Sequence, residues 1–187
     1  MEAIHPKASK PLEISGINLR IKNTFEPAHP GTLITRHYVS ALKRVEVITG
    51  YDKMLIIDVY DPLMVGSVGS DLQIMQVFFN HRISYTFKAT SANSISTVIW
   101  ESDFSQALID DLGSKFEKVT VEKAAMVCLL GTNMDQPGLL AKSAMALAKS
   151  DINILSAGFA LRKVNIQFLI AREHFKTAII ELNKALG

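Results

Sequence analysis

The sequence predicts an α+β fold of two ferredoxin-like βαββαβ repeats, the first inserted in the second. Residues 126–187 alternate short apolar runs with amphipathic stretches, in the order strand, helix, strand, strand, helix. Two landmarks of this segment, Gly138 and Ile152, have counterparts 69 positions earlier, at Gly69 and Ile83. Such a period indicates one supersecondary unit used twice, and the helices of a unit of this kind cover one face of an antiparallel sheet.

The upstream repeat is expected over residues 54–122. Its first helix should begin at Ser70, because a serine side chain can accept a hydrogen bond from a free N–H group at a helix start. A second helix over Asp103–Leu112 should stop at Gly113, since glycine is favoured just after a helix. The expected strands are Met54–Tyr60, Ile83–Lys88, Ile95–Trp100 and Lys118–Val121, and the expected core residues include Leu72, Met75, Phe78, Phe79 and Trp100.

The downstream repeat is expected over residues 123–187, with residues 42–52 as its remaining part. In its loop, Asn133–Gly138, Asp135 is the expected helix cap just before Pro137. The break at Ser150-Asp151 ends that helix. The expected strands are Met126–Leu130, Ile152–Phe159 and Val164–Ala171, with Phe168 in the core, and Phe175, Ala178, Ile179 and Leu182 mark a last amphipathic helix.

The insertion follows from a missing strand. The downstream repeat ends on a helix at Gly187 and so lacks the sixth strand of its unit. Residues 44–49 can supply it, with Gly50-Tyr51-Asp52 as a turn into the upstream repeat. Without residues 40–50, the downstream sheet would then have an exposed edge.

Residues 1–41 do not fit the repeat. Four prolines punctuate them, and only Leu19–Lys22 has the pattern of a strand. Because this segment cannot bury enough apolar surface to form a domain by itself, we expect it to be the end of another domain followed by a linker.

Composition limits the class of protein. The 187 residues are 48% hydrophobic, which suffices for one core of ordinary size or two small ones. No apolar run reaches the roughly 18–20 residues of a membrane helix, and the first ten residues lack the apolar block of a secretory signal, so a cytoplasmic protein is expected. The net charge of +2 arises from interspersed signs, and nucleic acid is therefore not an expected partner.

Cysteine and histidine usage gives no sign of a metal site. Cys128 is the single cysteine and is expected to be a small buried hydrophobic residue in mid-strand. The histidines are scattered without the spacing of metal ligands. They are His5, His29, His37, His81 and His174.

Several short motifs occur in a fixed order along the chain. They are His-Pro-Lys-Ala-Ser from His5, the run Ile21–Thr35 with its Asn-Thr-Phe and Pro-Gly-Thr clusters, SANSIS at Ser91–Ser96, Gly-Thr-Asn-Met from Gly131 with Pro-Gly-Leu after it, and VNIQFLI at Val164–Ile170. Together they resemble the carboxy-terminal part of aspartate kinases (aspartokinases), and the resemblance covers nearly the whole chain. It implies that residues 1–41 close a kinase domain and that the two repeats are ACT domains.

The resemblance implies the regulatory part of an aspartate kinase, which senses lysine or threonine and controls phosphorylation of L-aspartate in amino-acid biosynthesis. Complete members begin with a catalytic domain whose Lys-Phe-Gly-Gly-Thr motif occurs nowhere here, so this chain should be inactive alone. No cofactor is expected in it, whereas ATP and Mg would serve the parent enzyme. The expected partners are the amino-acid effector, the kinase domain of the parent enzyme and a second copy in a homodimer formed through the ACT domains.

In ACT domains of this kind the effector is held by the loop after the first strand, the start of the first helix and the second strand. Free amide groups at a helix start favour a carboxylate, and Asp71 or the carbonyl groups of residues 84–86 can accept from the ligand ammonium group. The residues implied in the upstream repeat are Met64, Ser67, Gly69, Ser70, Asp71, Ser84, Tyr85 and Thr86, with Ser91 on the next turn.

The downstream repeat offers a second implied site in the same places. Pro137 makes its loop rigid, and Asp135 opposes carboxylate binding at that helix start, so an interface is the alternative there. The residues implied are Asn133, Asp135, Gln136, Gly138 and Leu139 from the loop and helix, and Asn153, Ile154 and Leu155 from the strand.

Other interpretations stay open. Ser67, Gly69 and Ser70 also suit a helix start that binds nothing. Members that bind lysine tend to carry acidic residues where this chain has Thr86 and Ala92, which argues against a lysine-specific pocket. The regulatory part of an ectoine-pathway aspartate kinase insensitive to lysine is one alternative. An ACT-type oligomerisation module without ligand is a further alternative. An RNA-recognition module is disfavoured, because neither third strand carries the aromatic motif of that class.

Overall fold

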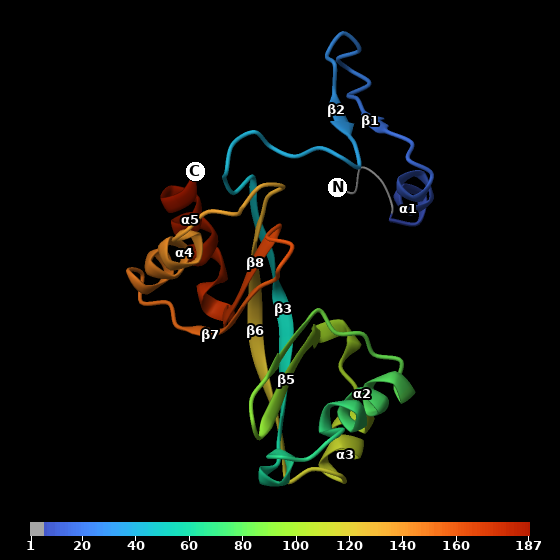
Figure 1. The fold of residues 1–187 in the computed structure, drawn as a ribbon, viewed down its shortest axis with the longest axis vertical. Coiled ribbons are helices and arrows are strands. Elements are labelled where there is room, and N and C mark those ends of the chain that lie inside the picture. The colour runs from blue at the N-terminus through green and yellow to red at the C-terminus, as the bar shows by residue number, and fades with distance from the viewer. Residues whose placement is uncertain (1–5) are drawn as a thin grey trace. The chain divides into compact units, whose positions relative to one another are not determined.

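The computed structural model describes residues 6–187, and the chain divides into two compact units, Met1–Leu42 and Lys43–Gly187. Each unit has its own secondary structure (Figure 1). His5 and the other residues before Pro6 lie outside the described residues.

The first unit contains one helix and one pair of short strands. Helix α1 spans Pro6–Ile14, and β1 (Leu19–Ile21) pairs antiparallel with β2 (Thr32–Ile34). Gly31 has φ +74°, and a Cβ there would lie 2.2 Å from the carbonyl oxygen of Ile21, so only glycine fits where the pair closes. The sequence pattern predicted β1 but neither α1 nor β2.

The second unit is built on one six-stranded antiparallel sheet (Figure 1). The strand order is β4-β5-β3-β6-β8-β7, so each half of the sheet has the order of a ferredoxin-like unit. The bounds are β3 Val47–Tyr60, β4 Phe87–Thr90, β5 Ser94–Trp100, β6 Lys118–Leu130, β7 Ile154–Phe159 and β8 Asn165–Ala171.

Strands β3 and β6 run through both repeats and join their sheets. Val47 to Tyr51 of β3 pair with the second-repeat half of β6, and Met54 to Tyr60 pair with the first-repeat half. The first repeat is therefore inserted in the second. This arrangement was predicted from the sixth strand that the downstream repeat lacks in the sequence. A β-bulge between Tyr51 and Met54 marks the junction of the repeats.

The turn expected at Gly50-Tyr51-Asp52 is absent, and this part of the prediction is wrong. Gly50 lies inside β3, where a Cβ would be 2.2 Å from the Met126 carbonyl oxygen and 2.9 Å from Cε2 of Phe175. The residue is glycine because a neighbouring backbone approaches closely, and not because the chain reverses there.

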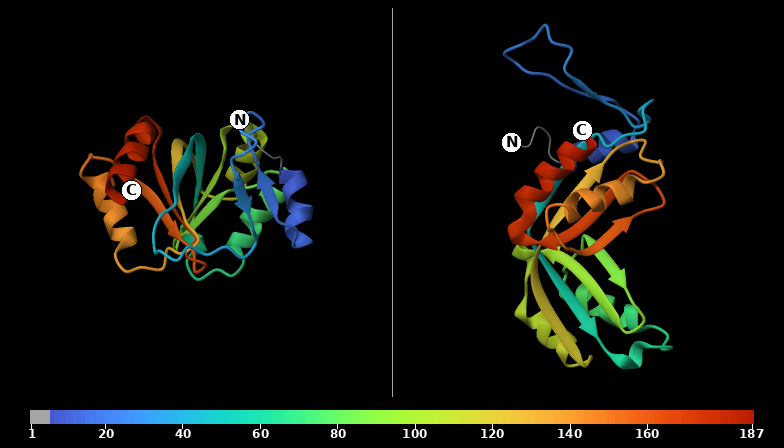
Figure 2. Two further views of the ribbon diagram at one scale, coloured as in Figure 1. Left: turned by 90° about the horizontal axis from the view of Figure 1, so that it is seen from above. Right: turned by 90° about the vertical axis from the view of Figure 1, so that its left-hand side faces the viewer.

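Two helices cover the sheet in each repeat. In the first repeat these are α2 (Ser70–Asn80) and α3 (Gln106–Gly113), and in the second they are α4 (Leu139–Ala148) and α5 (Phe175–Leu186). Figure 2 shows the two pairs on the two outer sides of the bent sheet. Three single turns of 3₁₀-helix precede helices: η1 at Pro62–Met64, η2 at Glu101–Asp103 and η3 at Arg172–His174.

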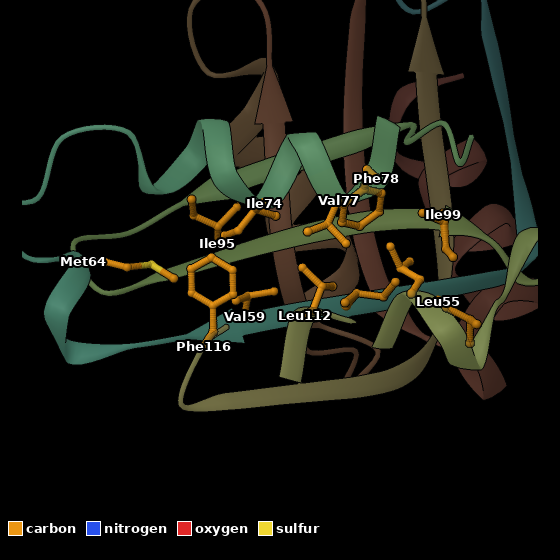
Figure 3. Packing of buried hydrophobic residues seen from close by; sticks show 12 residues of the cluster. Leu55, Val59, Met64, Ile74, Val77, Phe78, Ile95, Ile99, Leu112 and Phe116 are labelled. Atoms are coloured by element: carbon orange, nitrogen blue, oxygen red, sulfur yellow. The ribbon is translucent and has the colours of Figure 1, made fainter. Parts of the chain in front are cut away.

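Each repeat has its own hydrophobic core between helices and sheet. In the first repeat, side chains of α2 such as Ile74, Val77 and Phe78 point toward β3 and β5 (Figure 3). In the second repeat, Phe168 and Leu182 are fully buried. Burying such side chains provides most of the stabilisation of α+β units of this size.

A third cluster packs on the face of the sheet away from the helices. It combines Met54 and Val98 of the first repeat with Cys128 and Leu169 of the second. Cys128 is buried as predicted, and burial raises the pKa of its thiol. Because this cluster draws on both repeats, the two repeats share buried apolar contacts on this face of the sheet.

The helix starts differ from the sequence prediction. Neither Ser70 nor Asp135 caps a helix: α2 and α4 begin after Gly69 (φ +93°) and Gly138 (φ +80°), and neither start has a side-chain cap. Glycine takes the left-handed conformation at these positions without strain, so the backbone makes the turn that a capping side chain would otherwise stabilise.

Several element boundaries and core assignments also need correction. β4 begins at Phe87 rather than Ile83 and β7 at Ile154 rather than Ile152, because Ile83 and Ile152 still donate hydrogen bonds back to the preceding helices, to the carbonyl oxygens of Phe78 and Leu147. Leu72 and Phe79 are not in the core, with 70% and 75% of their surface exposed. They lie on the outer face of α2, opposite Ile74 and Phe78.

Candidate functional site

The loop between β3 and α2 is held by its own hydrogen bonds. Asp61 Oδ1 accepts from the Leu63 N–H group at 2.8 Å and caps η1. The Ser67 hydroxyl donates to the Leu63 carbonyl oxygen. Met64 lies in the core with 8% of its surface exposed. Of the sequence-predicted site residues here, Ser67 is engaged within the loop and the Met64 side chain faces away from solvent.

The start of α2 presents backbone donors. The Gln73 N–H group donates to the Gly69 carbonyl oxygen at 3.0 Å, as a first helical bond does. The N–H groups of Ser70, Asp71 and Leu72 precede it and have no acceptor within the helix. A Cβ at Gly69 would meet nothing within 4 Å, so this helix start is open on the side to which that Cβ would point.

Asp71 is paired with a lysine of the edge strand. Lys88 Nζ of β4 lies 2.8 Å from Oδ1 and 2.6 Å from Oδ2 of Asp71. The Lys88 side chain is 23% exposed and that of Asp71 is 49% exposed. The sequence suggests the Asp71 carboxylate as an acceptor for the ammonium group of a ligand. In the structure this carboxylate already accepts from the ammonium group of Lys88.

The polar residues before β4 lie in an extended segment rather than in the strand itself. Ser84 and Tyr85 are exposed. Thr86 donates to the Val98 carbonyl oxygen from both its N–H group (2.8 Å) and its hydroxyl (3.2 Å). Ser91 lies in the turn to β5, where its N–H group donates to Ser94. Thr86 is thus engaged with β5, and Ser84 and Tyr85 remain open to a ligand.

In the second repeat, Asp135 also has a lysine partner. Lys163 Nζ lies 2.6 Å from its Oδ1, and this hydrogen bond holds the pKa of the Asp135 carboxyl group below its usual value. Asn133 accepts the Arg44 N–H group at its backbone carbonyl oxygen. Of the other implied residues here, Leu139 is buried, Ile154 is partly buried against the core, and Gly138, Asn153 and Leu155 are exposed.

A basic depression lies at the start of α4. Its volume is about 340 Å³, and Lys43, Arg44 and Lys142 line it together with Gln136 and Pro137. These cations oppose the effect expected of Asp135, since they favour an anion at this helix start. Sequence reasoning missed them, because the three cations come together only through the pairing of the segment before β3 with the loop before α4.

The described residues offer neither a metal site nor a membrane-spanning helix. Among residues 6–187, no three His, Cys, Asp or Glu side chains lie close enough together to hold a metal ion. In the same part of the chain, no helix has the length and apolar character to cross a membrane.

The inserted pair of repeats, each with a first helix that begins after a glycine in the left-handed conformation, defines the class by its architecture: a pair of tandem ACT-type domains. No family model matches the chain. It is 36% identical over 192 residues to aspartate kinase Ask_Ect of Stutzerimonas stutzeri (strain A1501), a match that covers 100% of this chain and 40% of that protein. The chain spans about two fifths of the length of that relative.

Solved structures agree with this match. The aspartate kinase of Clostridium acetobutylicum has a TM-score of 0.87 at 24% identity, covering 98% of this chain and 45% of that one. The regulatory subunit of aspartate kinase from Thermus flavus has a TM-score of 0.67 at 16% identity, covering 76% of this chain and 99% of that one. The chain corresponds to the carboxy-terminal regulatory region of aspartate kinases, as the sequence motifs predicted.

Proposed function

We propose that the first repeat binds an amino-acid end product, lysine or threonine, and that its occupancy controls phosphorylation of L-aspartate by the catalytic part of the same enzyme. The site consists of the loop 61–69, the start of α2 and the segment 84–86. The observation that carries the proposal is the open helix start at Gly69, whose free N–H groups suit a ligand carboxylate.

The proposal assigns the ligand groups to particular atoms. The carboxylate lies at the N–H groups of Ser70, Asp71 and Leu72. The ligand ammonium group is held by backbone carbonyl oxygens of residues 84–86, because Asp71 already has Lys88 as its partner. For binding to regulate, it must favour one arrangement of the protein over another, and a tenfold preference corresponds to about 1.4 kcal/mol.

The first unit is proposed to belong to the kinase domain of the longer enzyme. The proposed boundaries are 1–41 for this part, 54–122 for the first ACT domain, and 42–52 with 123–187 for the second. The unit exposes large apolar side chains, Ile14 by 72% and Phe25 by 93%. Such exposure is unusual for a free surface and suits a segment that packs on a larger domain.

The cellular location of the protein is proposed to be the cytoplasm.

A homodimer through the ACT domains is part of the proposal. The loop of the first repeat exposes Leu63 by 78%, Val65 by 62% and Val68 completely. Burying these side chains between two copies would remove apolar surface from water next to the helix start. Sedimentation velocity at micromolar concentration is expected to show a dimer, and a monomer would contradict this part.

A second candidate follows from the relative's name. Ask_Ect accords with the alternative of an ectoine-pathway aspartate kinase that is insensitive to lysine. The absence of acidic residues at Thr86 and Ala92 favours the same alternative. In that case the regulatory region is the same and the effector differs.

Isothermal titration calorimetry with lysine, threonine and methionine, each added separately, tests the proposal. Threonine or lysine is expected to bind at millimolar concentration or below. If none of the three amino acids binds, the proposed sensing of lysine or threonine is wrong, and the region either serves oligomerisation alone or binds the different effector of the second candidate.

A further inference from the structure

We infer that Lys88 acts as an internal counter-ion that excludes cationic amino acids from the first-repeat site. The inference rests on the proposed function and specifies its ligand: an amino acid whose side chain carries no charge. It assigns to Lys88 the role of a specificity-determining residue, which no feature of the sequence indicated.

The geometry places Lys88 beside the proposed site. Its ammonium group, from edge strand β4, contacts both carboxylate oxygens of Asp71 in the first turn of α2, at 2.6 and 2.8 Å. The pair therefore bridges the edge of the sheet and the helix start that borders the site. The Lys88 side chain is the less exposed partner, at 23% against 49% for Asp71.

The charges of the site are satisfied within the chain. The loop 61–69, the first turn of α2 and residues 84–88 contain three charged side chains, namely Asp61, Asp71 and Lys88. Asp61 accepts from the Leu63 N–H group, and Asp71 is held by Lys88. A second ammonium group would find no unpaired carboxylate at Asp71 and would be repelled by Lys88. An uncharged side chain meets no such repulsion, and Ser84 and Tyr85 offer it polar and aromatic contacts.

The alternative is that the pair is an ordinary surface ion pair. Exposed Lys–Asp pairs contribute little to stability, and many have no function. The two interpretations differ in one measurable respect: only a counter-ion in the site discriminates between ligands of similar size and different charge.

The experiment compares L-lysine with L-norleucine, which has the same four-carbon side chain without the terminal ammonium group, and with L-threonine. Calorimetric titration of the full chain and of its Lys88→Met variant measures the affinities. The wild-type chain is expected to bind norleucine or threonine and to bind lysine at least tenfold more weakly. In Lys88→Met the lysine affinity is expected to rise at least tenfold, which corresponds to about 1.4 kcal/mol, and threonine affinity to change less than threefold.

Lys184→Met is the matched control. It removes the same charge from an ion pair with Glu181 (2.7 Å) on α5 of the other repeat, and it should leave lysine binding unchanged. Lys88→Gln, which keeps a polar group, serves as a second variant if circular dichroism shows that Lys88→Met does not fold.

The outcomes separate the inference from the proposed function. If the wild-type chain binds lysine as tightly as Lys88→Met does, the inference is wrong and the sensing role stands. If Lys88→Met loses threonine binding, Lys88 is a ligand contact and not a barrier, and the inference is again wrong. If neither protein binds any of the three amino acids, the proposed function fails and the inference with it.

Discussion

Phe78 and Phe79 are neighbours in α2 but lie in opposite environments. Phe78 is 2% exposed in the first-repeat core, and Phe79 is 75% exposed. Successive positions of a helix are about 100° apart, so a pair of adjacent apolar residues cannot both face the sheet fully. Hydrophobicity alone placed both in the core, and only the packing shows which one is inside.

Replacing Phe78 by Ala is expected to lower the free energy of unfolding by about 3–5 kcal/mol, because a large buried side chain is lost and a cavity remains. The same change at Phe79 is expected to cost less than about 0.5 kcal/mol, since its ring contacts mainly water. Urea denaturation of the two variants measures both values. Equal losses would contradict the assigned orientation of α2.

The ion pair of Asp135 with Lys163 is expected to make the stability of the chain depend on pH. The hydrogen bond from Lys163 lowers the pKa of this carboxyl group in the folded chain, so its contribution to stability is present above the unfolded pKa of about 3.9 and is lost as the pH falls through the lower folded pKa. Titration of the carboxyl group by NMR is expected to give a pKa below 3.9. Lys163→Met should raise it toward the unfolded value, and an unchanged pKa would show that the ion pair does not persist in solution.

At the scale of elements, β3 depends on one glycine. Gly50→Ala would place a Cβ 2.2 Å from the Met126 carbonyl oxygen. Neither atom can move aside freely, because each is fixed by the backbone of a strand in the β3–β6 pair. We expect a loss of about 2 kcal/mol or more in the free energy of unfolding, because overpacking in such a place forces the strands apart.

Gly113→Ala is the control for that variant. Gly113 ends α3, and a Cβ there would meet nothing within 4 Å. Alanine is a better helix former than glycine, so this change is expected to be neutral or to stabilise by up to about 1 kcal/mol. If Gly50→Ala is as stable as Gly113→Ala in thermal unfolding, the close approach of β3 to β6 is absent in solution.

The order of the elements and the insertion were predictable from the sequence, because helical and strand periodicity are local and the repeat supplied a second copy of each signal. The continuity of β3 was not, since Gly50 has the local signature of a turn and its close neighbour is 76 positions away, at Met126. The candidate site was predictable to the same extent. Gly69 in the sequence indicates the loop and the helix start. The pairing of Asp71 with Lys88 joins two different elements and gives no periodic signal in the sequence.

At the scale of the whole second unit, the two repeats meet at Arg172. This residue of η3 in the second repeat contacts both carboxylate oxygens of Glu101 in η2 of the first, each at 3.1 Å. Its other terminal nitrogen donates to the Met54 carbonyl oxygen at 2.9 Å, next to the bulge that divides β3. Glu101 and Arg172 each follow the third strand of their repeat, so the ion pair joins equivalent positions.

Because β3, β6 and the third cluster are shared, we expect the two repeats to unfold in one cooperative transition. Trp100, the single tryptophan, packs edge-on against Tyr51 at the junction and reports its integrity by fluorescence. Hydrogen exchange in β5 and β8 reports the two repeats separately. In the wild-type chain the three denaturant midpoints are expected to coincide.

Arg172→Met should separate these transitions. It leaves the Glu101 carboxylate and the Met54 carbonyl oxygen without their partner at the junction, a loss of about 1–3 kcal/mol when a hydrogen-bonded group remains unsatisfied. The junction signal of Trp100 is then expected to change at lower denaturant than exchange in either strand. If all three midpoints instead fall together by the same amount, the shared strands alone couple the repeats, and a signal from one ACT domain reaches the other through β3 and β6 without the ion pair.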